Sequence, residues 1–178
     1  TKEQTCFYAR VLDAHVPQAM DVLSDIVLNA TFRQQELEKE KLVVIEELRN
    51  AEDDPADIIH DYVEKAILPH HSLGFPIIGT EENLRRFNRD DLVSHVRAHY
   101  HPSRIVVAAA GKVDHESLVK LSRRHLGRLS AGAGDRARHP GPTRGLRPAL
   151  REYERPISQA HVSLGTVGYS IHHKDRYP

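Results

Sequence analysis

Two glutamates on one amphipathic stretch are the residues whose type and spacing could do chemistry. Residues 35–51 contain strong helix formers and neither Pro nor Gly, which predicts a helix. At 3.6 residues per turn, Glu40 and Glu47 lie about 20° apart around the helix axis, at the edge of its apolar stripe. The residues of that stripe are Leu37, Val44, Leu48 and Ala51.

This position predicts that both carboxylates face the protein core at least in part. Burying a carboxylate is costly unless a cation lies close to it. A metal ion held by Glu40 and Glu47 would meet that requirement, and so would Arg or Lys side chains in partly buried ion pairs. The spacing alone leaves both interpretations open.

The chain also contains 13 histidines, which makes zinc spacings a second candidate. His95 and His99 are separated by one helical turn, and His101 follows shortly, so the trio could bind zinc. Surface histidines are the simpler interpretation, because His101 lies beyond the predicted end of that helix. Neither an H-E-x-x-H nor an H-x-x-E-H motif is present in the sequence.

Composition excludes several classes of protein. The 25 basic and 25 acidic residues balance, so no overall field draws the chain to nucleic acid or to an anionic membrane. No apolar run approaches the ~20 residues that a membrane-spanning helix needs. The single Cys6 cannot form an intramolecular disulfide, which favours a reducing compartment.

The pattern of elements predicts an α+β domain with helices packed on one face of a mixed or antiparallel sheet. Strands are predicted where β-forming residues cluster, at 5–12, 104–110, 149–154 and 160–165. Helices are predicted at 17–30, 35–51, 58–67, 81–87, 88–100 and 114–126. Residues 1–178 are taken as one domain, interrupted by an exposed Gly-, Pro- and Arg-rich loop at about 130–148.

Three segments of the chain resemble the pitrilysin/insulinase family of zinc peptidases. They are TKEQTCFYARVL, EKEKLVVIEELRNAEDDP, and LGFPIIGTEENLRRFNRDDLVSHVRAHYHPSRIVVAAAGKVDHESLV. The resemblance runs with little interruption from Thr1 to Leu126, and it is greatest to the bacterial branch similar to mitochondrial processing peptidase. It implies a processing-peptidase-like metallohydrolase domain.

The resemblance also implies roles for particular residues. In this family two histidines of an H-x-x-E-H helix and a glutamate of a later helix hold one zinc ion. Glu47 matches that metal-binding glutamate, and Glu40 matches a second acidic residue that supports the site. Thr1, Lys2 and Glu3 match the last residues of an edge strand that binds extended peptide.

Because the H-x-x-E-H motif is not in the sequence, we expect the chain to be part of a first, zinc-binding domain that is inactive by itself. The resemblance implies an intact parent that is a zinc metalloendopeptidase acting on extended or unfolded peptides, with a second homologous domain or subunit as partner. A bacterial cytoplasmic location is expected, with the mitochondrial matrix as the alternative.

Two other functions stay open. Some members of the family lack the zinc motif and serve as non-catalytic subunits or core proteins, so a structural role is the first alternative. The second alternative is a lone binding domain whose Arg-rich loop contacts acidic partners.

Overall fold

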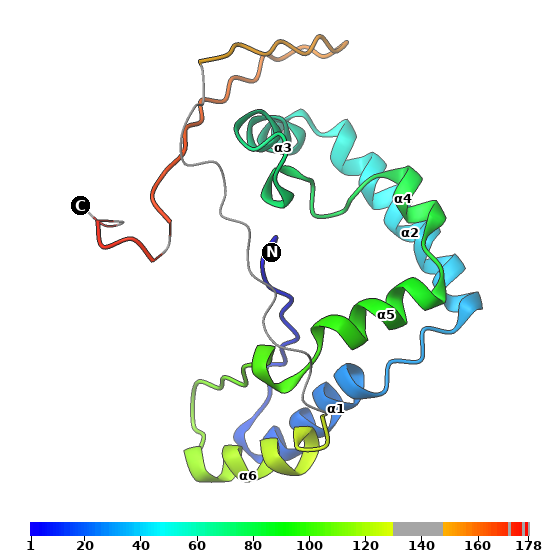
Figure 1. Ribbon diagram of the computed structural model, residues 1–178, viewed down its shortest axis with the longest axis vertical. Helices are drawn as coiled ribbons and strands as arrows, with labels where there is room; N and C mark the ends of the chain where they lie inside the picture. The colour runs from blue at the N-terminus through cyan, green and yellow to red at the C-terminus, as the bar shows by residue number, and fades with distance from the viewer. Residues whose placement is uncertain (130–147, 171, 176, 178) are drawn as a thin grey trace. The chain divides into compact units, whose positions relative to one another are not determined.

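The computed structural model describes residues 1–129, 148–170, 172–175 and 177. In this part of the chain the regular structure is helical, and Figure 1 labels the six α-helices along the chain. The α-helices are α1 (Val16–Leu28), α2 (Gln34–Asp53), α3 (Pro55–Ile67), α4 (Glu81–Arg86), α5 (Arg89–His99) and α6 (His115–Leu126). The short 3-10 helices are η1 (Asp13–His15), η2 (Ser72–Gly74) and η3 (Pro102–Arg104).

The described chain divides into two compact units. The first unit contains Thr1–Glu3, Lys41–Arg85 and the described residues from 148 onward. The second contains Gln4–Glu40 and residues 86–129. Helix α2 begins in the second unit and ends in the first.

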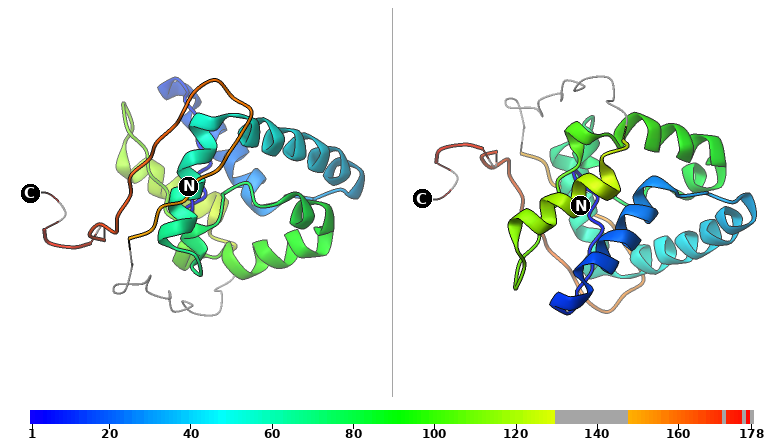
Figure 2. Two further views of the ribbon diagram at one scale, coloured as in Figure 1. Left: turned by 90° about the horizontal axis from the view of Figure 1, so that it is seen from above. Right: turned by 90° about the horizontal axis from the view of Figure 1, so that it is seen from below.

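In the second unit, α1 and α6 pack against each other and lie side by side in Figure 2. Met20 of α1 is buried. Local sequence signals fix the start of α5: the Asn88 side chain accepts hydrogen bonds from the backbone N–H groups of Asp90 and Asp91, and the Asp91 carboxylate accepts one from Asn88. This reciprocal cap satisfies N–H groups that the helix itself leaves without partners.

In the first unit, the buried apolar side chains among the described residues lie on α2. Ile45 and Leu48 of α2 are buried. Asp54 caps α3 and Pro55 occupies the start of that helix, where its missing N–H costs nothing. The Tyr62 ring of α3 stacks on Tyr153 at a centroid distance of 3.9 Å, which attaches the segment after residue 148 to α3.

The predicted α+β class, with helices on one face of a mixed or antiparallel sheet, is wrong for the residues that the structure describes. None of the segments predicted as strands forms one: 5–12, 105–110, 149–154 and 160–165 have no strand assignment, and Arg104 belongs to η3. The physical reason is that a strand requires ladder hydrogen bonds to another segment. β-Forming residues such as Val106 and Val162 favour a strand only when a neighbour covers them, and in this chain both are exposed.

Two further expectations concern the chain as a whole. The loop predicted at about 130–148 lies, apart from Pro148, outside the described residues. No helix within the described ranges is long and apolar enough to cross a membrane.

Candidate functional site

Helix α2 carries both glutamates that the sequence singled out. Its bounds, Gln34–Asp53, confirm the helix predicted at 35–51. Leu48 is buried and Val44 is half-buried, as the apolar stripe predicted, whereas Glu40 and Glu47 are both exposed. The expectation that the two carboxylates face the core is therefore wrong. Ile45, which lies on the other side of Val44 from Glu47, takes up part of the buried face.

The side chains of Glu40 and Glu47 have no hydrogen bond or ion pair to any described residue. The ion-paired interpretation of these carboxylates therefore has no support in the described part of the chain. Glu47 offers two free carboxylate oxygens from a regular helix, which is what a hard or borderline metal ion can use.

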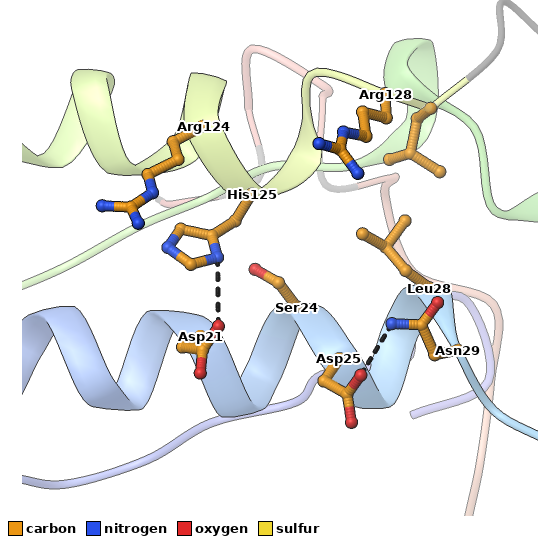
Figure 3. A pocket seen from close by; sticks show the side chains of 9 residues that line it. Asp21, Ser24, Asp25, Leu28, Asn29, Arg124, His125 and Arg128 are labelled. Carbon is orange, nitrogen blue, oxygen red and sulfur yellow. Dashed lines mark hydrogen bonds and ion pairs between the residues drawn. The ribbon is translucent and has the colours of Figure 1, made fainter.

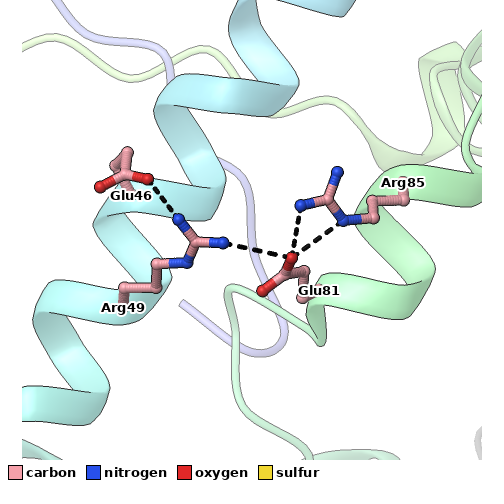
Figure 4. A network of polar contacts seen from close by, with 4 residues as sticks. All are labelled: Glu46, Arg49, Glu81 and Arg85. Carbon is pink, nitrogen blue, oxygen red and sulfur yellow. Dashed lines mark hydrogen bonds and ion pairs between the residues drawn. The ribbon is translucent and has the colours of Figure 1, made fainter.

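Two residues after Glu47 on the same helix, Arg49 belongs to a chain of ion pairs (Figure 4). Its Nη1 lies 2.6 Å from Glu46 Oε1 and its Nη2 lies 3.4 Å from Glu81 Oε1 at the start of α4. Glu81 also accepts from Arg85, with Nη2 at 2.5 Å and Nε at 2.9 Å. The hydrogen bond from Arg85 is the main cause that holds the pKa of the Glu81 carboxyl below its usual value, and the positive charge of Arg49 adds to this effect. This network joins α2 to α4 within the first unit.

The predicted substrate-binding residues Thr1, Lys2 and Glu3 also belong to the first unit. Lys2 Nζ forms an ion pair with Glu64 of α3 and donates to the Leu73 carbonyl at 2.9 Å. The Lys2 side chain is only 17% exposed, so its charge is committed to the protein itself. The substrate-binding role of these three residues stays a prediction.

The histidine trio does not form a metal centre. The rings of His95 and His99 lie 4.5 Å apart, and His101 is buried with its Nδ1 2.9 Å from Ser103 Oγ. More generally, the described residues contain no group of three or more His, Cys, Asp or Glu side chains that could hold a metal ion. Because a zinc site usually needs at least three protein ligands, the described residues do not form one by themselves.

Two family descriptions together match most of the chain. Residues 1–81 match "Insulinase (Peptidase family M16)", and residues 86–178 match "Peptidase M16 inactive domain". The chain therefore belongs to the pitrilysin/insulinase family of peptidases. Both Glu40 and Glu47 lie in the first matched segment.

Similar proteins occur in bacteria and mitochondria. The chain is 41% identical over 177 residues to a Bacillus subtilis protein named "Uncharacterized zinc protease YmxG", covering 99% of this chain and 42% of that protein. It is 33% identical over 172 residues to the mitochondrial-processing peptidase subunit beta of Bos taurus, covering 96% of this chain and 35% of the subunit. The chain thus spans less than half the length of these relatives.

Solved structures with a similar fold include bacterial peptidases. A protease from Helicobacter pylori matches with a TM-score of 0.65 at 18% identity, over 73% of this chain and 32% of the protease. A peptidase from Alicyclobacillus acidocaldarius described as M16-like matches with a TM-score of 0.62 at 22% identity, over 71% of this chain and 30% of that protein. At these identities the likeness concerns the fold alone.

The ion pair between Arg49 of α2 and Glu81 of α4 was not predicted from the sequence. The spacing of Glu81 and Arg85, four residues apart, was a readable signal for an ion pair along α4. The contact of Glu81 with Arg49 joins residues that are distant in sequence, and single-helix periodicity carries no information about such a pair.

Proposed function

We propose that the full-length protein, meaning the natural polypeptide that contains this chain, is a zinc-dependent endopeptidase, and that this chain supplies Glu47 as one ligand of the zinc ion. The other ligands are proposed to lie outside the present sequence, since its described residues contain no three-ligand group. The observation that carries the proposal is the exposed Glu47, without a protein partner among the described residues, in the segment that matches the insulinase description.

The surroundings of Glu47 suit a ligand that must be held in place. Ile45, two residues before Glu47, and Leu48, directly after it, are buried, and their burial fixes the orientation of this part of α2. Arg49 adds a polar connection to α4. A ligand on a regular, packed helix is positioned more precisely than one on a loop. Glu40, one heptad earlier on α2, is proposed to support the site by orienting a ligand or by adding negative charge.

The proposed substrates are extended or unfolded peptides, bound near Thr1, Lys2 and Glu3 by addition of a strand. A second homologous domain or subunit is the proposed partner, a view supported by the relative that is named as a subunit of a processing peptidase. A cytoplasmic location in a bacterium is part of the same proposal.

The deciding experiment measures bound zinc and peptide hydrolysis in the full-length protein and in three Glu→Gln variants. Glu47→Gln is expected to lower zinc affinity by more than about tenfold and to reduce hydrolysis in parallel, because even residues that only support a ligand contribute about tenfold. Glu40→Gln is expected to weaken zinc binding less than Glu47→Gln.

Glu52→Gln is the matched control for these variants. Glu52 lies on the same helix, is exposed, and has no side-chain partner among the described residues, so its substitution should leave zinc content unchanged. Unchanged zinc content in Glu47→Gln would reject the ligand assignment. A full-length protein that binds no zinc and hydrolyses no peptide would favour the non-catalytic subunit instead.

A further inference from the structure

The pocket between α1 and α6 of the second unit selects no class of ligand (Figure 3). In this pocket of about 580 Å³, the Asp21 carboxylate lies 3.4 Å from His125 Nδ1, and Asp25 accepts from the Asn29 side-chain amide at 2.6 Å. Because aspartates and arginines both line the pocket, its charge favours neither an anion nor a cation. The contacts of the first unit, in contrast, define a role for Lys2.

Lys2 connects residues 1–3 to two elements that are distant in sequence. Its Nζ forms an ion pair with Glu64 of α3 and donates a hydrogen bond to the Leu73 carbonyl of η2 at 2.9 Å. All of these residues belong to the first unit. The side chain of Lys2 is largely covered, and lysine side chains are seldom buried unless the ammonium group is paired. Lys2 therefore attaches its own segment to the protein.

Both partners of Lys2 lie on elements that are themselves fixed. Helix α3 packs against η2. The Leu73 N–H donates to Nδ1 of His71, so the N–H and the carbonyl of Leu73 are both engaged. Gly74, the next residue of η2, is buried. The position of the Lys2 ammonium group is thus set by α3 and η2.

Addition of a peptide strand to residues 1–3 would use their backbone, because a peptide bound in this way is held by main-chain hydrogen bonds. Thr1 and Glu3 are exposed, whereas Lys2 between them is half-buried. This alternation is typical of an extended segment with one face on the protein. Lys2 therefore contributes to peptide binding by fixing the place of this backbone, while its ammonium group stays paired with Glu64.

We infer that Lys2 is a positioning residue for peptide binding: its contacts with Glu64 and Leu73 hold residues 1–3 in the conformation with which an extended peptide pairs. This role rests on the proposed binding of substrate at residues 1–3. When a binding-competent conformation is populated for only part of the time, the apparent affinity falls by the populated fraction. Loss of the Lys2 contacts should thus weaken peptide binding and leave the chemical step unchanged, since none of these contacts involves Glu47.

The test measures binding of fluorescein-labelled casein, a polypeptide without a stable fold, by fluorescence anisotropy. The full-length protein is used with a chelator present, so that no zinc-dependent hydrolysis occurs. Lys2→Met removes the ammonium group and is expected to raise the Kd roughly three- to tenfold, between the effects of an exposed ion pair and of a hydrogen bond to a charged group. Lys2→Arg keeps a cation with several donors and should restore most of the affinity. With zinc present, the KM for casein should rise in parallel in Lys2→Met, while kcat and zinc content stay unchanged.

Glu64→Gln separates a positioning role from a direct contact with substrate. It removes the ion-pair partner, so a positioning role predicts a raised Kd in this variant as well. The double variant Lys2→Met/Glu64→Gln should bind no more weakly than Lys2→Met, because both changes remove the same contact. If Lys2 itself contacted the substrate, Glu64→Gln would free its ammonium group and leave the Kd unchanged or lower it. That result would overturn the inference. Glu64→Gln also keeps the test informative if Lys2→Met folds poorly.

Lys65→Met is the matched control. Lys65 is exposed on α3, has no side-chain partner among the described residues, and its substitution makes the same change in net charge as Lys2→Met. Casein binding in this variant should equal that of the unchanged protein. An equal loss in Lys65→Met and Lys2→Met would indicate general charge attraction and overturn the role of Lys2.

Failure of the proposed function gives a different result. Binding of casein that depends on Lys2, in a protein that neither binds zinc nor hydrolyses casein, would keep the positioning role and reject zinc-dependent hydrolysis. An active enzyme whose Kd and KM are unchanged in Lys2→Met would keep the hydrolysis and overturn the role of Lys2. If the unchanged protein bound no casein, both the binding of extended peptides at residues 1–3 and the role of Lys2 would be overturned.

Discussion

Arg49 Nη2 lies 3.4 Å from Glu81 Oε1, and this contact joins the middle of α2 to the first turn of α4. Arg49 is two residues after the proposed zinc ligand Glu47, so the same contact restrains the backbone from which Glu47 projects. Glu81 in turn is held by Arg85 one helical turn later. The relationship gives α2 a polar anchor in addition to the burial of Leu48.

Substitution of this pair should reveal a small coupling. Arg49→Gln and Glu81→Gln are each expected to lower the free energy of unfolding slightly, and the double variant should lose less than the sum, because both remove the same contact. Exposed pairs are weakened by salt, so the coupling should shrink as ionic strength rises. Denaturant unfolding of the full-length protein and its three variants, in low and high salt, measures it; strictly additive losses would contradict the contact.

Stability should also depend on pH through Glu81. Arg85 and Arg49 lower the pKa of its carboxyl in the folded protein relative to the unfolded chain. Because the pKa of Glu81 is lower in the folded protein, its ionised carboxylate stabilises the fold fully at pH values above the unfolded pKa of about 4.3. This stabilisation is lost as the pH falls through the folded pKa. Glu81→Gln should therefore destabilise at neutral pH and converge with the unchanged protein at acid pH. Parallel curves of unfolding free energy against pH would contradict this expectation.

The helices could be predicted from the sequence because their signals are local. Pro55 after Asp54, the reciprocal cap of Asn88 and Asp91, and Asp114 before α6 each satisfy N–H groups within the same segment. The sheet could not be judged in this way. A strand depends on a partner distant in sequence, and the β-forming residues in 104–110 or 160–165 indicate only that such a partner would be favourable.

For the site, periodicity correctly placed Glu40 and Glu47 on one helix but misjudged their exposure. The buried face of α2 is rotated from the predicted apolar stripe, because it includes Ile45 as well as Leu48. This rotation leaves Glu47 on the solvent side of the helix.

Gly74 is predicted to be intolerant of any side chain. It is buried, and a Cβ at this position would lie 2.0 Å from the Leu68 carbonyl oxygen, a backbone atom that cannot rotate away. Gly74→Ala is therefore expected to lower the free energy of unfolding by roughly 1–3 kcal/mol, the range typical of overpacking. It should also disturb the neighbouring Leu73 carbonyl, to which Lys2 donates.

Gly168→Ala is the control for this prediction, because no atom lies within 4 Å of the corresponding Cβ. Chemical denaturation of the two variants compares them directly. Equal stability of Gly74→Ala and Gly168→Ala would mean that the segment around Leu68 adapts without cost.

The 178-residue chain produced by itself is predicted to self-associate. Val162 and Leu164 are 84% and 95% exposed, and in soluble monomers neighbouring large apolar side chains are rarely both left uncovered. Val162 and Leu164 belong to one uncovered segment, so a second copy of the chain can bury both at once. Sedimentation velocity should show a weight-average sedimentation coefficient that rises with protein concentration.

The charged double variant Val162→Lys/Leu164→Lys should reduce this association, because burying two ammonium groups in a contact between copies is costly. Thr166→Lys/Gly168→Lys introduces the same charge in the same segment but removes no large apolar side chain, since both native residues are small and exposed. If net charge alone governed association, the two double variants would behave alike. A larger effect of the first pair would assign the association to the apolar side chains of 160–165.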